Sequence, residues 1–323
     1  MIQYVFFDLN DPLPESEEVI NVCFGIIIDS NSIQFDGNKY TCKSNCNITP
    51  IYVSNIGKNY LMSRTNSRHS LLSNLNILVI GSGSIGGYLA ELLIKSGCEK
   101  LSLIDPDILK ENNIFRHLLG ASFVDCSKVD ALSHYFAKCI PHITITPIKS
   151  TIEDAVQYKK ININKFDFIF FVTGNQNTNR WLENYIDINS INTTIIYGWN
   201  EPLDIGCHSV IVDTANKGRL SSLFQYSADY NCLYDITAYT APNQTITKNN
   251  SGCGGSFIPY GSEVSLRTAI NCLDLFKRKI DKQLQNNIII SQKGTGFYFK
   301  KSGLKQSPVY DEQQAIVDEK ELS

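Results

Sequence analysis

Short apolar runs alternate with amphipathic segments through the middle of the chain. Asn76–Ile80 is a β-branched run that stops at a glycine, as a buried parallel strand does. The following residues place Ile85, Leu89 and Leu93 on one side of a helix that closes at a Ser-Gly pair. Repetition of this pattern predicts an α/β fold with a Rossmann-like, doubly wound, mainly parallel sheet. Further strands are predicted at 100–104, 143–148, 168–172 and 193–197, and helices at 128–138, 178–188 and 263–279.

The two ends of the chain follow a different pattern. Residues 1–70 form a small strand-rich region, because 19–28 is a mixed apolar run and prolines interrupt any helix there. The last stretch, 301–323, is polar and is expected to be a mobile tail. Between them, 71–300 is expected to be the main domain, with a polar, turn-rich loop at about 240–262.

Composition narrows the class of protein without identifying it. Hydrophobic residues make up 43% of the 323 positions and charged residues 19%, a balance typical of a folded core. The formal net charge of -3 offers no basic field for nucleic acid or an anionic membrane. The chain begins without a basic leader, and no apolar run approaches the roughly 20 residues that cross a bilayer. Ten cysteines without a C-x-x-C pair indicate reduced thiols and no zinc knuckle, so we expect a soluble, cytoplasmic protein.

A glycine-rich loop carries the first sign of chemistry. Gly81, Gly83 and Gly86 lie directly between the first predicted strand and its helix. Glycines let the backbone approach phosphate groups, and the helix N-terminus offers free N–H groups and the positive end of the helix dipole. Asp105, at the end of the next strand, is placed to accept hydrogen bonds from a ribose. The constellation predicts a nucleotide site, but it suits the pyrophosphate of NAD as well as the phosphates of ATP.

Three polar residues after Asp105 separate these possibilities. Asn113 follows the acid by eight positions, Arg116 follows it by eleven, and Lys128 opens the next predicted helix. A guanidinium fork and a lysine charge suit a triphosphate, whereas a dehydrogenase has no comparable need for three phosphate-directed groups here. The alternative for Arg116 and Lys128 is simple solvation at the surface. Over 75–273 the combined spacing, with a one-residue slip before Lys128, resembles the ThiF/MoeB superfamily, which includes the ubiquitin-activating enzymes.

The resemblance implies an adenylyltransferase that uses ATP and Mg²⁺. The C-terminal glycine carboxylate of a ubiquitin-like protein would attack the α-phosphate, and this needs charge neutralisation and in-line positioning rather than a strong base. Arg116 and Lys128 would bind the phosphates, and Asn113 a phosphate or the ribose. The family usually has an acid after the fourth strand that holds Mg²⁺, and 172–180 contains none. Asn175 is the expected substitute, with the ion held mostly by phosphates and water.

The resemblance also implies a homodimer. In dimeric relatives an arginine before the first strand reaches the ATP of the other subunit. Arg64 and Arg68 lie in that region, although exposure on a connector explains them equally well.

Some members of the superfamily then capture the acyl group as a thioester on their own cysteine. Cys253 lies in a Cys-Gly-Gly-Ser-Phe-Ile-Pro-Tyr run just before the last predicted helix, where glycines leave a thiol uncovered. This run resembles bacterial ThiF-type proteins that accompany ubiquitin-conjugating-like partners, often in antiphage defence. Cys232 is the alternative thiol.

The other cysteines have structural explanations. Cys207 and His208 are neighbours on a strand and point to opposite faces, so they do not form a nucleophile–base pair. Small thiols in apolar helix or strand patterns are normally buried. This expectation applies to Cys98, Cys126, Cys139 and Cys272.

The sequence therefore predicts a ubiquitin-activating-type enzyme with Cys253, Arg116 and Lys128 in catalytic roles. Three other functions stay open: an adenylating enzyme without the thioester step, a catalytically impaired scaffold, and an NAD(P) oxidoreductase. The nucleotide is expected to contact Gly81, Gly83, Gly86, Asp105, Asn113, Arg116, Lys128 and Asn175, and no resident metal site is predicted.

Overall fold

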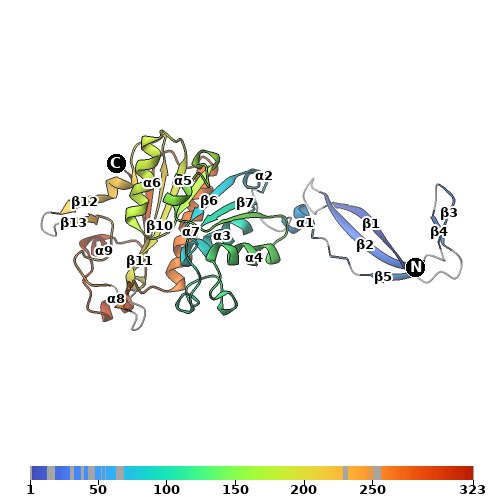
Figure 1. Cartoon of the computed structure of the whole chain (residues 1–323), viewed down its shortest axis with the longest axis horizontal. Coiled ribbons are helices and arrows are strands. Elements are labelled where there is room, and N and C mark those ends of the chain that lie inside the picture. The colour runs from blue at the N-terminus through green and yellow to red at the C-terminus, as the bar shows by residue number, and fades with distance from the viewer. Residues whose placement is uncertain are drawn as a thin grey trace. The chain divides into compact units, whose positions relative to one another are not determined.

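The computed structural model describes residues 2–12, 19–29, 33–37, 40–42, 48–51, 53–54, 56–62, 69–227, 232–246, 248–249 and 256–322. It divides into two compact units, Met1–Arg68 and His69–Ser323. Figure 1 shows the elements of both.

The first unit is built mainly of antiparallel strands. β1 (Ile2–Pro12) pairs with β2 (Val19–Asp29) over eleven residue pairs, and β5 (Ile48–Ile51) pairs with the other edge of β2. A hairpin joins β3 (Ile33–Phe35) to β4 (Tyr40–Cys42), and α1 (Lys58–Met62) follows. The strand-rich character expected for this region is present.

The second unit contains an eight-stranded sheet in the order β17-β16-β11-β10-β9-β6-β7-β8. The pairs from β8 to β10 are parallel, as predicted, and those from β10 to β17 are antiparallel. The parallel strands are β6 (Asn76–Ile80), β7 (Lys100–Ile104), β8 (Thr144–Ile148), β9 (Phe168–Phe171) and β10 (Thr194–Asn200). The antiparallel strands are β11 (Gly206–Asp213), β16 (Ile288–Lys293) and β17 (Val317–Glu321). The predicted doubly wound α/β fold is confirmed.

Helices cover both faces of this sheet. One face is packed by α2 (His69–Leu72), α3 (Ser84–Lys95), α4 (Lys128–Cys139) and α7 (Ser262–Ile280), and the other by α5 (Ile152–Gln157) and α6 (Gln176–Ile188). Two short helices, α8 (Phe297–Lys301) and α9 (Pro308–Glu312), pack in a smaller separate cluster. Short strand pairs join β12 (Phe224–Ser227) to β13 (Cys232–Asp235) and β14 (Lys248–Asn249) to β15 (Ser256–Phe257). No helix in the described part of the chain is long and apolar enough to span a bilayer.

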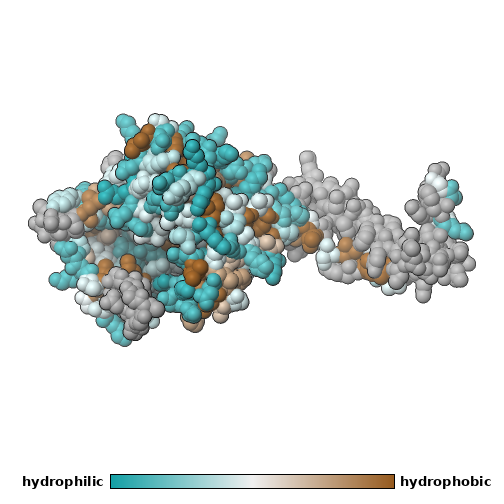
Figure 2. All heavy atoms as spheres, in the orientation of Figure 1, coloured by the Kyte–Doolittle hydropathy of each residue, from teal (hydrophilic) through white to brown (hydrophobic). Residues whose placement is uncertain are grey.

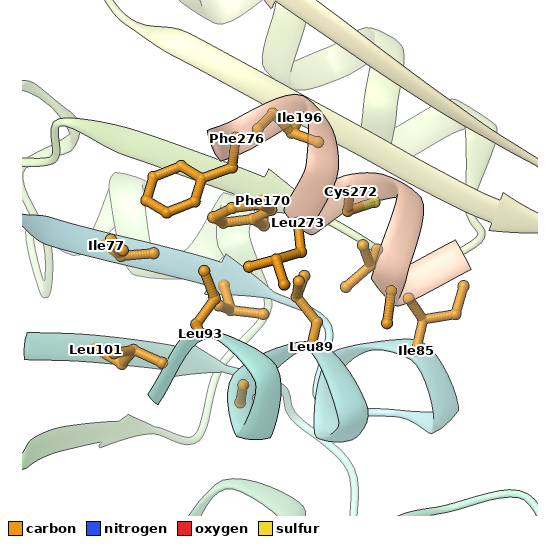
Figure 3. Packing of buried hydrophobic residues seen from close by; sticks show 14 of the residues in the cluster. Ile77, Ile85, Leu89, Leu93, Leu101, Phe170, Ile196, Cys272, Leu273 and Phe276 are labelled. Carbon is orange, nitrogen blue, oxygen red and sulfur yellow. The ribbon is translucent and has the colours of Figure 1, made fainter. Parts of the chain in front are cut away.

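Alternation along each strand divides the core between the two faces. Ile77 and Val79 belong to the cluster under α3, α4 and α7, whereas Leu78 and Ile80 pack with residues of α5 and α6. In Figure 3, Leu89 and Leu93 of α3 and Leu273 of α7 point toward one another, and Phe276 lies close to Phe170. Both faces of the central strands are therefore covered, which explains why those strands read as continuous apolar runs.

The prediction that residues 301–323 form a mobile tail is wrong. This segment contains part of α8, all of α9 and the edge strand β17, which pairs with β16 from Ile288↔Glu321 to Gln292↔Val317. Arg278 donates hydrogen bonds to both carboxylate oxygens of Glu319, at 2.7 and 2.9 Å. A charged edge strand is held by its backbone ladder and keeps its side chains in water, so it has no apolar signature.

Candidate functional site

The site lies where the strand order reverses. β7 flanks β6 on one side and β9 flanks it on the other, so the connections after β6 and β9 leave a crevice at the carboxyl ends of the strands. A cavity of about 580 Å³ opens there, within the range of about 300–1,000 Å³ typical of small-molecule sites. Seven of the eight predicted nucleotide residues line it: Gly81, Gly83, Asp105, Asn113, Arg116, Lys128 and Asn175.

The three glycines have three different surroundings. Gly81 has a φ of +94°, and its Cα faces the backbone of Thr173, where an added Cβ would lie at 3.0 Å. Gly83 caps the N-terminus of α3, and no atom of the described part of the chain would lie within 4 Å of a Cβ added to it. Gly86 does not line the cavity, because it packs under the loop, where a Cβ would lie 1.9 Å from the Gly81 carbonyl oxygen. Gly83 is therefore open to a ligand, whereas Gly86 sets the close approach of helix and loop.

Asp105 is hydrogen-bonded to the loop after β6 and to the loop after β7. Its Oδ2 accepts a hydrogen bond from the Ser82 amide at 2.7 Å, and its Oδ1 accepts one from the Asp107 amide at 2.8 Å. Burial raises the pKa of this carboxyl, and the nearby Lys128 ammonium opposes the shift. The carboxylate thus lines the cavity in a fixed orientation.

Lys128 is buried at the start of α4, so surface solvation does not explain it. Its Nζ lies 2.7 Å from Oδ2 of Asp107 and 3.9 Å from Oδ1 of Asp105. The Lys128 side chain is 11% exposed and that of Asp107 is 64% exposed. Sequence reasoning missed Asp107, although it stands only two positions after Asp105 at the same strand end.

Asn113 is the last residue of a single turn of 3-10 helix, Glu111–Asn113, and Arg116 follows it by three positions. Oδ1 of Asn113 accepts a hydrogen bond from the Lys110 amide at 3.1 Å, which fixes its amide group. The Arg116 guanidinium lies over the ring of Tyr260, 5.1 Å from its centre. Both residues line the cavity.

His117 also lines the cavity and was not anticipated. Its Nδ1 accepts a hydrogen bond from the Leu119 amide at 3.0 Å, so Nε2 carries the proton donated to the Ser82 carbonyl at 2.8 Å. Burial lowers the pKa of this imidazole. A neutral histidine thus supports the loop between Gly81 and Gly83.

Asn175 lines the cavity as the N-cap of α6. Its Oδ1 accepts hydrogen bonds from the amides of Asn177 at 3.0 Å and Thr178 at 3.3 Å. Both lone pairs of this oxygen are therefore engaged. Among the described residues, no group of three or more histidines, cysteines or acids is arranged to hold a metal ion.

Cys253, Arg64 and Arg68 lie outside the described residues. The segments on either side of 250–255 are β14 and β15, which pair with each other. Cys232 belongs to β13, opposite Ser227 of β12.

The remaining described thiols fall into two groups. Burial raises the pKa of Cys98 and Cys272 to about 12 and that of Cys207 to about 11, so these thiols are poor nucleophiles. Cys126 and Cys139 are exposed, so the expectation that they are buried is wrong. Cys126 precedes α4 and Cys139 is its last residue, and both lie beyond the buried face of that helix.

Cys207 and His208 have separate partners, as predicted. His208 lies near Ser291 Oγ at 2.9 Å and Glu201 Oε1 at 3.2 Å. Cys207 lies beside Asn271 of α7. The two side chains do not cooperate.

A mainly parallel sheet, a glycine loop before a helix N-terminus and two cationic side chains at one cavity define a Rossmann-like nucleotide-binding unit. Residues 59–260 match the ThiF family, and the chain belongs to it. This membership argues against the dehydrogenase alternative.

Two relatives and one solved structure illustrate the similarity. The chain is 26% identical over 232 residues to the ATP-dependent ubiquitin transferase-like protein Cap2 of Pseudomonas aeruginosa, covering 69% of this chain and 39% of that protein. For Cap2 of Vibrio cholerae the identity is 27% over 256 residues, covering 74% and 41%. The chain thus spans about two fifths of the length of these relatives. The structure of E. coli MccB with ATP matches at 17% identity and a TM-score of 0.54, covering 79% of this chain and 66% of that chain, which supports the fold.

Proposed function

We propose that this chain is an ATP-dependent adenylating enzyme that activates the C-terminal glycine carboxylate of a ubiquitin-like protein. The observation that carries the proposal is the convergence of Asp105, Asn113, Arg116 and Lys128 on one cavity beside a helix N-terminus. The names of the Cap2 relatives support a ubiquitin-like partner.

The cations of the cavity would neutralise a triphosphate. Arg116 offers a bidentate fork, and Lys128 offers a point charge. Lys128 must exchange Asp107 for a phosphate oxygen. Because the Asp107 side chain is mostly exposed to water, we expect the Lys128–Asp107 ion pair to contribute no more than about 1 kcal/mol to stability. Replacing Asp107 by a phosphate oxygen therefore costs little.

Mg²⁺ would enter with the triphosphate. With Oδ1 of Asn175 engaged in capping α6, the ion would keep phosphate and water ligands, as Mg²⁺ commonly does. The protein's own contribution is then the placement of Arg116, Lys128 and the backbone amides at the start of α3.

We further propose that Cys253 takes the acyl group as a thioester for a ubiquitin-conjugating-like partner, and that the enzyme works as a homodimer in the cytoplasm. The support is the Cys-Gly-Gly run and its position in the chain, seven residues before Tyr260, which lines the cavity. A role in antiphage defence follows from the same resemblance.

ATP–pyrophosphate exchange with a ubiquitin-like protein that ends in a free glycine tests adenylation. Arg116→Ala should slow exchange by about 10²-fold or more, the scale of losing a transition-state charge donor. Arg180→Ala, which removes an exposed arginine of α6 outside the cavity, is the matched control. A normal rate for Arg116→Ala would remove Arg116 from the mechanism.

The thioester needs its own experiment. Cys253→Ala should keep exchange and lose a reductant-sensitive adduct with the modifier. Persistence of the adduct would point to another thiol, with Cys232→Ala the next variant. Full product turnover by Cys253→Ala would favour an adenylating enzyme without a thioester step.

A scaffold is the second candidate function, because the described residues 172–180 contain no acid where the family usually has one. Retained ATP and partner binding without any exchange would support it.

A further inference from the structure

A strained turn lies beside the cavity. The 3-10 turn Pro202–Asp204 contains two consecutive non-glycine residues in the left-handed region, Leu203 at φ +52° and Asp204 at φ +56°. Such conformations are unfavourable for L-residues and persist where surrounding contacts enforce them, often at functional sites. The contacts of this turn therefore indicate what the strain maintains.

Two hydrogen-bond partners of the turn flank Tyr260. The Leu203 amide donates to the Pro259 carbonyl at 2.7 Å, and Oδ1 of Asp204 accepts from the Gly261 amide at 2.7 Å. The residues before and after Tyr260 are thus bound to one rigid turn. This arrangement fixes the backbone from which the Tyr260 side chain enters the cavity.

Tyr260 contacts two parts of the nucleotide site. Its hydroxyl lies 3.2 Å from Oγ of Ser84, the first residue of α3, where Ser84 is the donor. Its ring lies under the Arg116 guanidinium, 5.1 Å from ring centre to Cζ, which is within reach of a cation–π interaction. Arginine has a long flexible side chain, and the ring restricts where its charged end lies.

We propose that Tyr260 is a positioning residue for Arg116, held in place by the Pro202–Asp204 turn. The ring keeps the guanidinium fork at the cavity before a ligand enters, so that a polyphosphate meets a preorganised donor. The inference rests on the proposed function for the identity of the ligand, ATP. Tyr260 acts through Arg116 and forms no bond to the reacting atoms.

A double-mutant cycle with ATP binding tests the proposal by calorimetry. Tyr260→Leu should weaken ATP binding by about tenfold, the scale of a partly desolvated cation–π contact. Tyr260→Phe keeps the ring and should restore most of the affinity. In an Arg116→Ala background, Tyr260→Leu should have no further effect. Tyr298→Leu, at an exposed tyrosine outside the cavity, is the matched control.

The turn supplies a second, independent variant. Asp204→Ala removes the acceptor for the Gly261 amide, and it should weaken ATP binding in the same direction as Tyr260→Leu but have no added effect on top of it. Asp204→Asn keeps an acceptor oxygen and tolerates a positive φ, so it should rescue binding.

Two results would overturn the inference. One is an equal loss of affinity from Tyr260→Leu with and without Arg116, which would mean a purely structural role. The other is equal ATP binding by Tyr260→Leu and Tyr260→Phe. Because the cycle measures binding of ATP alone, it is separate from exchange: failed exchange with an intact cycle would overturn only the proposed function.

Discussion

A single methyl group added at Gly86 should distort the glycine loop that lines the nucleotide cavity, although Gly86 itself does not line it. The Cβ of Gly86→Ala would lie 1.9 Å from the Gly81 carbonyl oxygen, and ordinary contact begins at 3.4 Å. Loop and helix must therefore separate by about 1.5 Å.

The loop has little room to make this movement. The Gly81 amide donates to the Ile104 carbonyl at 2.8 Å, and the Gly81 Cα faces the backbone of Thr173. Overpacking of this kind costs about 1–3 kcal/mol, and the better helix propensity of alanine returns at most about 1 kcal/mol. Because backbone confines the loop on both sides, we take the upper end of this cost, about 3 kcal/mol, and expect a net loss of about 2 kcal/mol.

Thermal unfolding and ATP calorimetry give the two measurements. A loss of about 2 kcal/mol lowers the melting temperature of a unit of this size by about 4–8 °C. ATP affinity should fall by more than about tenfold, because the amides at the start of α3 no longer face the ligand as a set.

Gly83→Ala is the matched control for this prediction. No atom of the described residues lies within 4 Å of its added Cβ, so the melting temperature should change little, while the methyl group blocks the approach of a phosphate. Gly86→Ala with the wild-type melting temperature and wild-type ATP affinity would refute the packing argument.

Three other predictions concern protonation, thiols and the C-terminal strand. Burial lowers the pKa of His117 below its ordinary 6.5, so the unfolded chain binds a proton that the folded chain resists, and stability should be lost as pH falls through 6.5. The melting temperature of His117→Gln should therefore depend less on pH between 7.5 and 5.5 than that of the wild type. Equal pH dependence of the two melting temperatures would contradict this prediction. Iodoacetamide at pH 8 should not alkylate Cys98, Cys207 and Cys272 in the folded protein, because a thiol pKa of 11 or 12 leaves a thiolate fraction of about one in a thousand or less. Rapid alkylation of these thiols, detected by mass spectrometry, would show that the core opens. Ending the chain before Val317 should lower the melting temperature by removing a paired strand and the Arg278–Glu319 contact, whereas an unchanged temperature would mean that β17 contributes nothing.

Much of the site could be predicted because its signals are local. The glycine loop follows β6 directly and Asp105 follows β7 directly, while Asn113 and Arg116 stand eight and eleven positions after Asp105. Figure 2 shows a mostly hydrophilic surface on the visible face of the second unit, in agreement with the composition.

What sequence reasoning missed depends on contacts between distant segments. His117 is hydrogen-bonded to the Ser82 carbonyl in the glycine loop, 35 positions earlier in the chain. Tyr260 contacts Arg116, which lies 144 positions before it. No spacing rule reports such pairs, because they arise only when separate elements pack together.

The amino-acid sequence by itself determined the α/β pattern and the glycine loop, because hydrophobic periodicity and backbone freedom act within a few residues. It also determined the spacing of the polar residues Asn113 and Arg116 after Asp105. Only the tertiary structure decided that Gly86 packs while Gly83 is open, that Lys128 is buried against Asp107, and that β17 completes the sheet. Burial, ion pairing and edge pairing depend on which distant atoms exclude water from a group, and that is a property of the assembled fold.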